Sequence, residues 1–295
     1  MLAAILLGIS AAASQSFSYL YSKRFISNNG TSIQLLLWSH LVMGFFSALL
    51  LFFLLRHISL PPFRQYVIPL LACSIFYLVG QISFFMALKY SDASRLSPLL
   101  ALKIIMVALL SMFFYEKGCN LQQWIAVGAC FSGALLSSWS GGLIHRYGFF
   151  YLISACFWYS ASDIWIKELI TAVDCGTYSG LVAAALSYLL TGVVAIGCFR
   201  FFRLPQRKNI SVVLAFSLFW FAGILFLFVC MMLSSPIFAN IMQSSRGLIS
   251  IMLGVWLSYR GHTDLEAKIP LRAIMQRIFA AILMAGAVII FAHGS

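Results

Sequence analysis

Two basic side chains stand deep inside apolar stretches of the sequence. Lys103 lies in "SPLLALKIIMVALL" (97–110), with seven uncharged residues before it and twelve after it. Arg246 lies in "NIMQSSRGLISIMLG" (240–254). A cation at this depth in hydrocarbon costs at least ~2.5–3.5 kcal/mol on insertion scales, so each is expected to face the protein interior and an anion. That anion is either an acidic side chain of the same chain or an anionic group on a solute.

Asp163 is the comparably embedded acid, in "WYSASDIWIKEL" (158–169). Three roles are open for it. It can form a local salt bridge with Lys167 at i+4, neutralise Lys103 or Arg246 from across the bundle, or carry a proton. The planar guanidinium fork of Arg246 also suits a carboxylate or phosphate on a solute.

Polar and aromatic side chains recur at helical spacing near these charges. Asn240 and Gln243 precede Arg246 and begin a stripe of small and polar residues, which indicates either close helix packing or a face that lines a solute pathway. The stripe continues with Gly247, Ser250 and Gly254. Elsewhere, Tyr77 and Gln81 lie one turn apart. The residues predicted to contact a solute are Lys103, Arg246, Asn240, Gln243, Asp163, Gln81, Tyr77, Tyr19, Gln15 and Trp220.

Several classes of chemistry are excluded by what the sequence lacks. It has no GxxxxGK[ST] loop for ATP, no HExxH metalloprotease motif and no GxSxG nucleophile elbow. Its seven acids, five histidines and seven cysteines are dispersed, with no metal-ligand spacing and no disulfide framework. We therefore predict no metal, no cofactor and no enzymatic activity.

The elements that position these residues are predicted to be membrane-spanning helices. Hydrophobic residues make up 62% of the 295-residue chain and charged residues only 9%. Open sheet edges cannot face lipid, so the expected fold is an all-α integral membrane bundle. The ten predicted spans are 2–22, 33–55, 66–88, 94–114, 121–140, 149–170, 175–198, 209–233, 236–259 and 272–292. The first span resembles a signal peptide but lacks the basic n-region.

The net charge of +12 is concentrated in the loops rather than in a nucleic-acid-binding patch. The loops that join helices 1–2, 3–4, 5–6, 7–8 and 9–10 carry most of the Lys and Arg residues. Positive-inside counting places these loops in the cytoplasm and both termini outside it. The expected surroundings are a lipid bilayer, and no nucleic-acid partner is expected.

The two halves of the chain share a plan. An offset of about 144 residues aligns "YSKRFI" (21–26) with "WIKELI" (165–170) and "FFYEKG" (113–118) with "WLSYRG" (257–262). The predicted organisation is a first five-helix repeat over 1–140, a linker over 141–148 and a second repeat over 149–295. Because five is odd, the second repeat is inverted in the membrane, which is the architecture of many secondary transporters.

One long segment, "FFMALKYSDASRLSPLLALKIIMVALLSMFFYEKGCNLQQWIAVGACFSGALL" (84–136), resembles the helix 3–4–5 signature of EamA domains in the drug/metabolite transporter superfamily. The second half resembles it more weakly in the same order. This resemblance implies ten helices in two inverted five-helix repeats, a central cavity lined by helices 1, 3, 4, 6, 8 and 9, and solute export or exchange without ATP. The chain departs from the family at Lys103, where a small residue or proline is usual, and at Tyr259-Arg260, where a glutamate should close helix 9.

The predicted function is secondary active transport of a small metabolite with an anionic group, such as an amino acid or organic acid, by alternating access around a midplane cavity. Lys103 and Arg246 would hold the anion, Asn240 and Gln243 would orient it, and Asp163 would balance charge or exchange a proton. A proton or a counter-transported metabolite is the expected coupled species, in a monomer or homodimer in the bacterial cytoplasmic membrane. One alternative is export of uncharged or cationic aromatic compounds, with the buried charges as structural salt bridges. Another is a non-transporting membrane enzyme or scaffold.

Overall fold

The computed structural model describes residues 1–88, 90, 100, 102–115, 120–138, 146–198, 207–246, 249, 252–253 and 271–293. Within these residues the chain is helical and contains no strand. The α-helices are α1 Leu2–Ser27, α2 Ser32–Leu54, α3 Phe63–Leu88, α5 Leu102–Tyr115, α6 Leu121–Ser138, α7 Arg146–Val173, α8 Ser179–Cys198, α9 Arg207–Leu233, α10 Pro236–Ser244 and α12 Leu271–His293. A 3₁₀ turn, Gly176–Tyr178, leads into α8.

Each of the ten predicted spans overlaps one of these helices. The ninth span is described as helix α10 only over Pro236–Ser244, and most of its remainder lies outside the described residues. Three residues of the predicted polar stripe and two sequence features of the family resemblance also lie outside the described residues. The stripe residues are Gly247, Ser250 and Gly254. The features of the resemblance are Tyr259-Arg260 and Glu116, the acidic residue of "FFYEKG" (113–118).

Five of the described helices are long and apolar enough to cross a membrane: Leu2–Ser27, Ser32–Leu54, Phe63–Ala87, Gly176–Cys198 and Asn209–Leu233. Leu102–Phe114 is a shorter apolar helix. Large apolar side chains also point outward, among them Phe45, Phe113 and Ile196, which are 65%, 84% and 64% exposed. An apolar perimeter of this kind is the surface that a bilayer covers.

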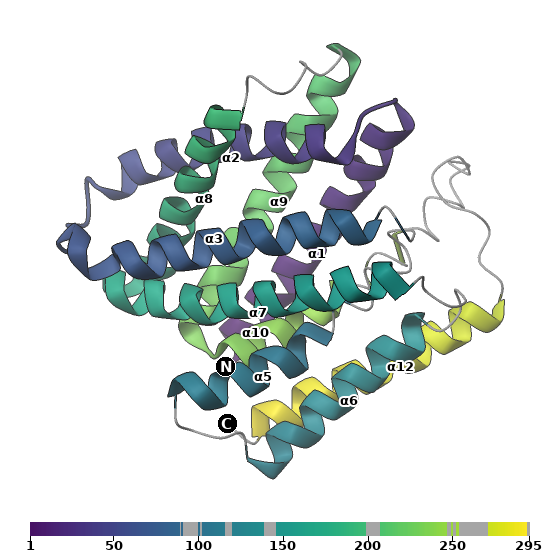
Figure 1. Ribbon diagram of the computed structural model, residues 1–295. Coiled ribbons are helices and arrows are strands. Elements are labelled where there is room, and N and C mark those ends of the chain that lie inside the picture. The colour runs from purple at the N-terminus through teal and green to yellow at the C-terminus, as the bar shows by residue number, and fades with distance from the viewer. Residues whose placement is uncertain are drawn as a thin grey trace.

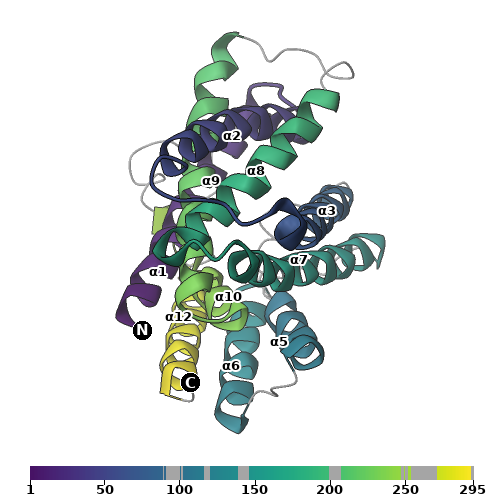
Figure 2. The same ribbon diagram turned by 90° about the vertical axis from the view of Figure 1, so that its left-hand side faces the viewer.

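The helices of the first half pack mainly on helices of the second half. In Figures 1 and 2, α3 runs beside α7 and α6 beside α12, while α1 packs along α9 and α2 along α8. Small residues allow this approach: a Cβ added to Gly44 of α2 would lie 2.8 Å from the Cα of Gly192 of α8. Both views also place the start of α1 and the end of α12 close together. The halves are therefore interleaved rather than arranged as separate bodies.

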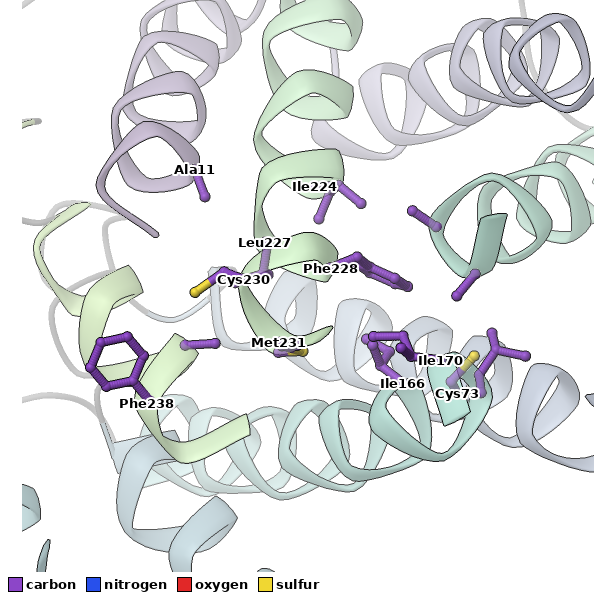
Figure 3. Close-up of a cluster of buried hydrophobic side chains, with 14 of the residues drawn as sticks. Ala11, Cys73, Ile166, Ile170, Ile224, Leu227, Phe228, Cys230, Met231 and Phe238 are labelled. Atoms are coloured by element: carbon purple, nitrogen blue, oxygen red, sulfur yellow. The ribbon is translucent and has the colours of Figure 1, made fainter. Parts of the chain in front are cut away.

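One part of the main apolar core lies where α7, α9 and α10 meet. Figure 3 shows Phe228 and Met231 of α9 close to Ile166 and Ile170 of α7, with Phe238 of α10 on the other side. Because lipid tails are as apolar as these side chains, close packing rather than exclusion from water holds such helices together. Packing of this core positions α7 and α10, which carry Asp163 and Asn240.

Candidate functional site

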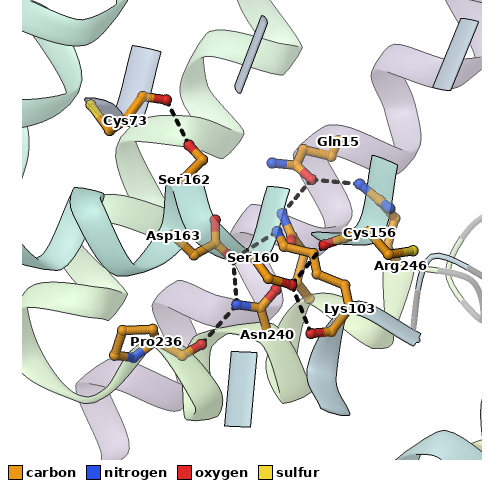
Figure 4. A network of polar contacts seen from close by, with 11 residues as sticks. Gln15, Cys73, Lys103, Cys156, Ser160, Ser162, Asp163, Pro236, Asn240 and Arg246 are labelled. Carbon is orange, nitrogen blue, oxygen red and sulfur yellow. Dashed lines mark hydrogen bonds and ion pairs between the residues drawn. The ribbon is translucent and has the colours of Figure 1, made fainter. Parts of the chain in front are cut away.

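The Lys103 and Asp163 side chains form an ion pair between α5 and α7 (Figure 4). The Lys103 Nζ lies 2.7 Å from the Asp163 Oδ2, and the two side chains are 14% and 6% exposed. The Asn240 Nδ2 of α10 donates to the same Oδ2 at 2.6 Å and to the Pro236 carbonyl at 2.8 Å. Asp163 therefore joins α5, α7 and α10. Of the roles left open for Asp163, neutralisation of Lys103 is the one that the structure contains.

The local alternative, an i+4 salt bridge between Asp163 and Lys167, is not the arrangement adopted. The Lys167 Nζ donates instead to the backbone carbonyls of Met231, Met232 and Ser234, at 2.7, 3.3 and 2.9 Å. Helical spacing made this salt bridge available. The end of α9 supplies three acceptors that the sequence around Lys167 does not reveal.

Arg246 meets an amide rather than a carboxylate. Its Nη1 donates to the Gln15 Oε1 of α1 at 3.0 Å, and the Gln243 Nε2 donates to the same oxygen at 2.9 Å. The Arg246 Cζ lies 5.3 Å from the centroid of the Tyr19 ring, within cation–π range. Among the described residues, no carboxylate lies within ion-pair distance of the guanidinium. Its positive charge is thus uncompensated in this part of the chain.

A matching set of three positions surrounds each cation. Gln15, Ser16 and Tyr19 of α1 contact Arg246, whereas the residues 144 positions later, Tyr159, Ser160 and Asp163 of α7, contact Lys103.

The serines make the same contact in both sets. The Ser16 Oγ donates to the Arg246 carbonyl at 3.0 Å, and the Ser160 Oγ donates to the Lys103 carbonyl at 3.1 Å. A difference follows at the third position, which is Tyr19 beside Arg246 but Asp163 beside Lys103.

Hydrogen-bonded aromatic residues connect the two charged groups. The Gln81 Nε2 donates to the Tyr77 hydroxyl at 2.8 Å, and the Tyr188 hydroxyl donates to the same oxygen at 3.4 Å. The Trp220 Nε1 donates to the Tyr188 hydroxyl at 3.2 Å, and the Trp220 ring meets the Tyr19 ring edge-on at 5.9 Å. Tyr19, Tyr77 and Trp220 are each partly exposed although they contact one another across helices.

Two members of this aromatic group were not predicted. Tyr188 lies in the apolar run of α8, and no charge near it in the sequence marks it. Tyr159 could have been found, because it lies one helical turn before Asp163; its ring centroid is 6.2 Å from that of Tyr77 and 5.7 Å from the Lys103 Nζ.

The ten predicted residues thus fall into three connected sets: Lys103, Asp163 and Asn240; Gln15, Tyr19, Gln243 and Arg246; and Tyr77, Gln81 and Trp220. Within the described residues, no group of three His, Cys, Asp or Glu side chains could hold a metal ion.

Residues 2–139 match the EamA-like transporter family. The first half of the chain is therefore similar to the EamA-like transporter family. The matched EamA region holds five of the predicted site residues, and the other five lie beyond it. The five within the match are Gln15, Tyr19, Tyr77, Gln81 and Lys103.

Two relatives share shorter segments with this chain. An "Uncharacterized transporter in cobO 3'region" of Sinorhizobium sp. is 42% identical over 55 residues, which are 19% of this chain and 39% of the relative. The "Probable 4-amino-4-deoxy-L-arabinose-phosphoundecaprenol flippase subunit ArnE" of Hamiltonella defensa is 33% identical over 73 residues, which are 25% of this chain and 66% of the relative. Each match covers less than two thirds of the relative's length.

The fold is shared with a solved structure over almost the whole length. A crystal structure described only as that of a protein superposes with a TM-score of 0.71 at 16% sequence identity and covers 98% of both chains. At this identity the likeness concerns the fold alone, and it extends to the second half of the chain.

Proposed function

We propose that this protein is a secondary active transporter of a small metabolite with an anionic group, and that Arg246 binds that group. The proposal rests on the difference between the partners of two deep cations. Lys103 has Asp163 at 2.7 Å, whereas the described side chains in contact with Arg246 are the neutral Gln15 amide and the Tyr19 ring. Lys103, Asp163 and Arg246 together leave one positive charge, which an anion of the solute would balance.

The guanidinium retains the hydrogen-bonding capacity that such a ligand needs. Arginine offers five N–H donors in a planar fork, and Gln15 accepts from one nitrogen of Arg246. A carboxylate or phosphate can engage two of the remaining donors side by side. Gln243 and Arg246 donate to the same Gln15 oxygen, so Gln243 and Gln15 would orient the end of the solute that Arg246 binds.

Lys103 takes a different part in this proposal. Its charge is already balanced by Asp163, so we assign it first to the α5–α7–α10 junction that Asp163 and Asn240 complete. Asp163 balances its charge. Exchange of a proton at Asp163 would release Lys103 toward the anion and couple transport to pH.

The aromatic set would contact the less polar part of the solute. Tyr19 and Trp220 meet edge-on beside Arg246, and Tyr77 continues the set through Tyr188. Partly exposed aromatic rings bury apolar surface of a ligand at little entropic cost.

Alternating access follows from the proposed inverted repeat over 1–140 and 149–295. In order along each half, the helices are α1, α2, α3, α5 and α6, then α7, α8, α9, α10 and α12. The first helix of each half packs on the third helix of the other, as α1 on α9 and α7 on α3. The two second helices, α2 and α8, pack on each other, and so do the two fifth helices, α6 and α12. A two-fold axis between the halves would produce this exchange, and the matched serine contacts of Ser16 and Ser160 support such an axis. Rocking of the halves would expose the site to each side in turn.

A second candidate is transport of uncharged or cationic aromatic compounds. The neutral Lys103–Asp163 pair and the aromatic contacts favour it.

The Hamiltonella relative is named as a flippase subunit for a phosphate-linked lipid, which would present an anion to Arg246 on a much larger molecule. The relatives are bacterial, and we place the protein in the bacterial cytoplasmic membrane.

Counterflow into proteoliposomes tests the proposal. Purified protein is reconstituted and screened with amino acids, nucleotides, other organic anions and aromatic cations, with and without a pH gradient. For the anion transported best, Arg246→Met should lower uptake roughly 10- to 150-fold, as expected for loss of hydrogen bonds to a charged group worth about 1.5–3 kcal/mol. Arg246→Lys should retain part of the anion uptake, because it keeps the positive charge.

Arg56→Met is the matched control, because Arg56 is an exposed arginine at the end of α2 whose guanidinium lies 4.8 Å from the Phe52 ring. It should transport like the unaltered protein. Anion uptake that is indifferent to Arg246→Met contradicts the assignment, and uptake of aromatic cations instead supports the second candidate.

A further inference from the structure

The junction between α9 and α10 gathers backbone carbonyls that their own helix leaves unpaired. α9 ends at Leu233, and α10 begins at Pro236 after Ser235, whose Oγ accepts from the Phe238 N–H at 3.2 Å. The last carbonyls of a helix have no partner within the helix and lie at the negative end of its dipole. This end of α9 therefore attracts a positive charge.

The Lys167 ammonium fills that position. It donates to the carbonyls of Met231, Met232 and Ser234 at 2.7, 3.3 and 2.9 Å, which uses all three of its protons. Among the described residues, no carboxylate lies within ion-pair distance of it. Within the described residues, its direct hydrogen-bond partners are these three carbonyl oxygens.

The carbonyls are held in place from two sides. Ile166 and Ile170, on either side of Lys167 in α7, are buried against the end of α9 (Figure 3). On the α8 side, the Gly180 N–H donates to the Met232 Sδ at 3.4 Å, and a Cβ at Gly180 would lie 3.1 Å from the Phe228 carbonyl oxygen. The oxygens thus form a rigid cradle rather than a flexible chain end.

Convergent backbone carbonyls at an interrupted helix are the ligands by which membrane proteins bind monovalent cations. We propose that the α9–α10 junction is a monovalent-cation site that the chain fills with its own Lys167 ammonium. The tethered ammonium gives this junction a permanent cation. Without it, Na⁺, K⁺ or a small alkylammonium would occupy the same three oxygens.

The test is the thermal stability of the detergent-solubilised protein with Lys167→Ala. Melting is followed in choline, sodium, potassium and methylammonium chloride at equal ionic strength, choline being too bulky for the cradle. The variant should melt roughly 2–4 °C higher in at least one of the small cations than in choline, because a ligand that binds only the folded state stabilises it. The unaltered protein should melt equally in all four salts.

Thr171→Ala is the control on the same helix, since the exposed Thr171 donates to the Lys167 carbonyl and does not touch the cradle. It should show no cation preference. If Lys167→Ala is not recovered folded, the Lys167→Gln variant is solubilised in the same four salts. The fraction of monodisperse protein should then be higher in the small-cation salts than in choline chloride. Equal behaviour of the variants in all salts overturns the proposal. The readout needs no solute, so its failure is distinct from failure of the anion site at Arg246.

Discussion

The surroundings of Lys103 and Arg246 differ at one decisive position. Each cation lies against three residues of a neighbouring helix, at positions 144 residues apart in the two halves. The serine is the same in both sets, but the carboxylate of Asp163 beside Lys103 has the phenol of Tyr19 as its counterpart beside Arg246. Matching positions of α1 and α7 therefore place a carboxylate beside Lys103 and only neutral described side chains beside Arg246.

This difference separates structural from binding roles. A compensated pair is costly to break, because the remaining member is left as an unpaired buried charge. An uncompensated cation can be removed with less damage to the fold, since its removal leaves no buried carboxylate without a partner. Stability should therefore depend most on the Lys103 side, and ligand binding most on the Arg246 side.

The largest effect is expected from Asp163→Ala. It leaves Lys103 without its carboxylate and Asn240 with only one of its two described acceptors, the Pro236 carbonyl, which should lower the free energy of unfolding by about 3–5 kcal/mol. The double variant Asp163→Ala with Lys103→Met should recover much of this loss, because no unpaired charge remains. Thermal melting of the solubilised protein measures both.

Asp174→Asn removes an exposed carboxylate just after the end of α7 and should leave melting unchanged; asparagine tolerates the positive φ of 37° at this position. If the single Asp163→Ala variant is as stable as the double variant, the ion pair is not the source of the stability.

A smaller effect is expected from Gln15→Glu, which gives Arg246 the kind of partner that Lys103 already has. The new carboxylate would stand where the amide oxygen now lies, 3.0 Å from the guanidinium. Binding of a solute anion should fall roughly tenfold, equivalent to about 1.4 kcal/mol, while the melting temperature stays equal or rises. Counterflow across a range of anion concentrations measures the change in apparent affinity.

Gln15→Met separates charge from hydrogen bonding, because it removes the amide without adding a carboxylate. It should bind the anion better than Gln15→Glu does. The opposite ranking would indicate that Gln15 itself, and not the charge of Arg246, dominates the contact.

The helices could be predicted from sequence because an apolar run of about 20 residues that must satisfy its backbone in lipid has few alternatives to a helix. All ten predicted spans overlap a described helix, and the transporter family suggested by residues 84–136 is the one whose model matches residues 2–139. The depth of Lys103 and Arg246 also sufficed to mark them as residues in need of partners.

The partners themselves could not be derived from spacing. Asp163 is four residues from Lys167 and sixty from Lys103, yet it pairs with Lys103, because α9 ends beside Lys167 and offers it three carbonyls. Tyr188 carried no signal in its apolar run. Contacts between helices depend on where each helix ends and how it is rotated, and a single sequence does not encode these in a local pattern.

The smallest effect is expected from the two serines that contact the cation-bearing backbones. Ser16 and Ser160 are both fully buried, and each also donates to the carbonyl four residues earlier in its own helix, at 2.8 and 2.7 Å.

Ser16→Ala and Ser160→Ala should each lower the free energy of unfolding by about 0.5–1.5 kcal/mol, the net value of one hydrogen bond, and by the same amount within error. Equal losses would follow from a two-fold relation between the halves, because the same contact is then removed from equivalent places. Unequal losses, measured by melting of the two variants side by side, would mean that the serines match in sequence position but differ in environment, and that the comparison holds only for the charges.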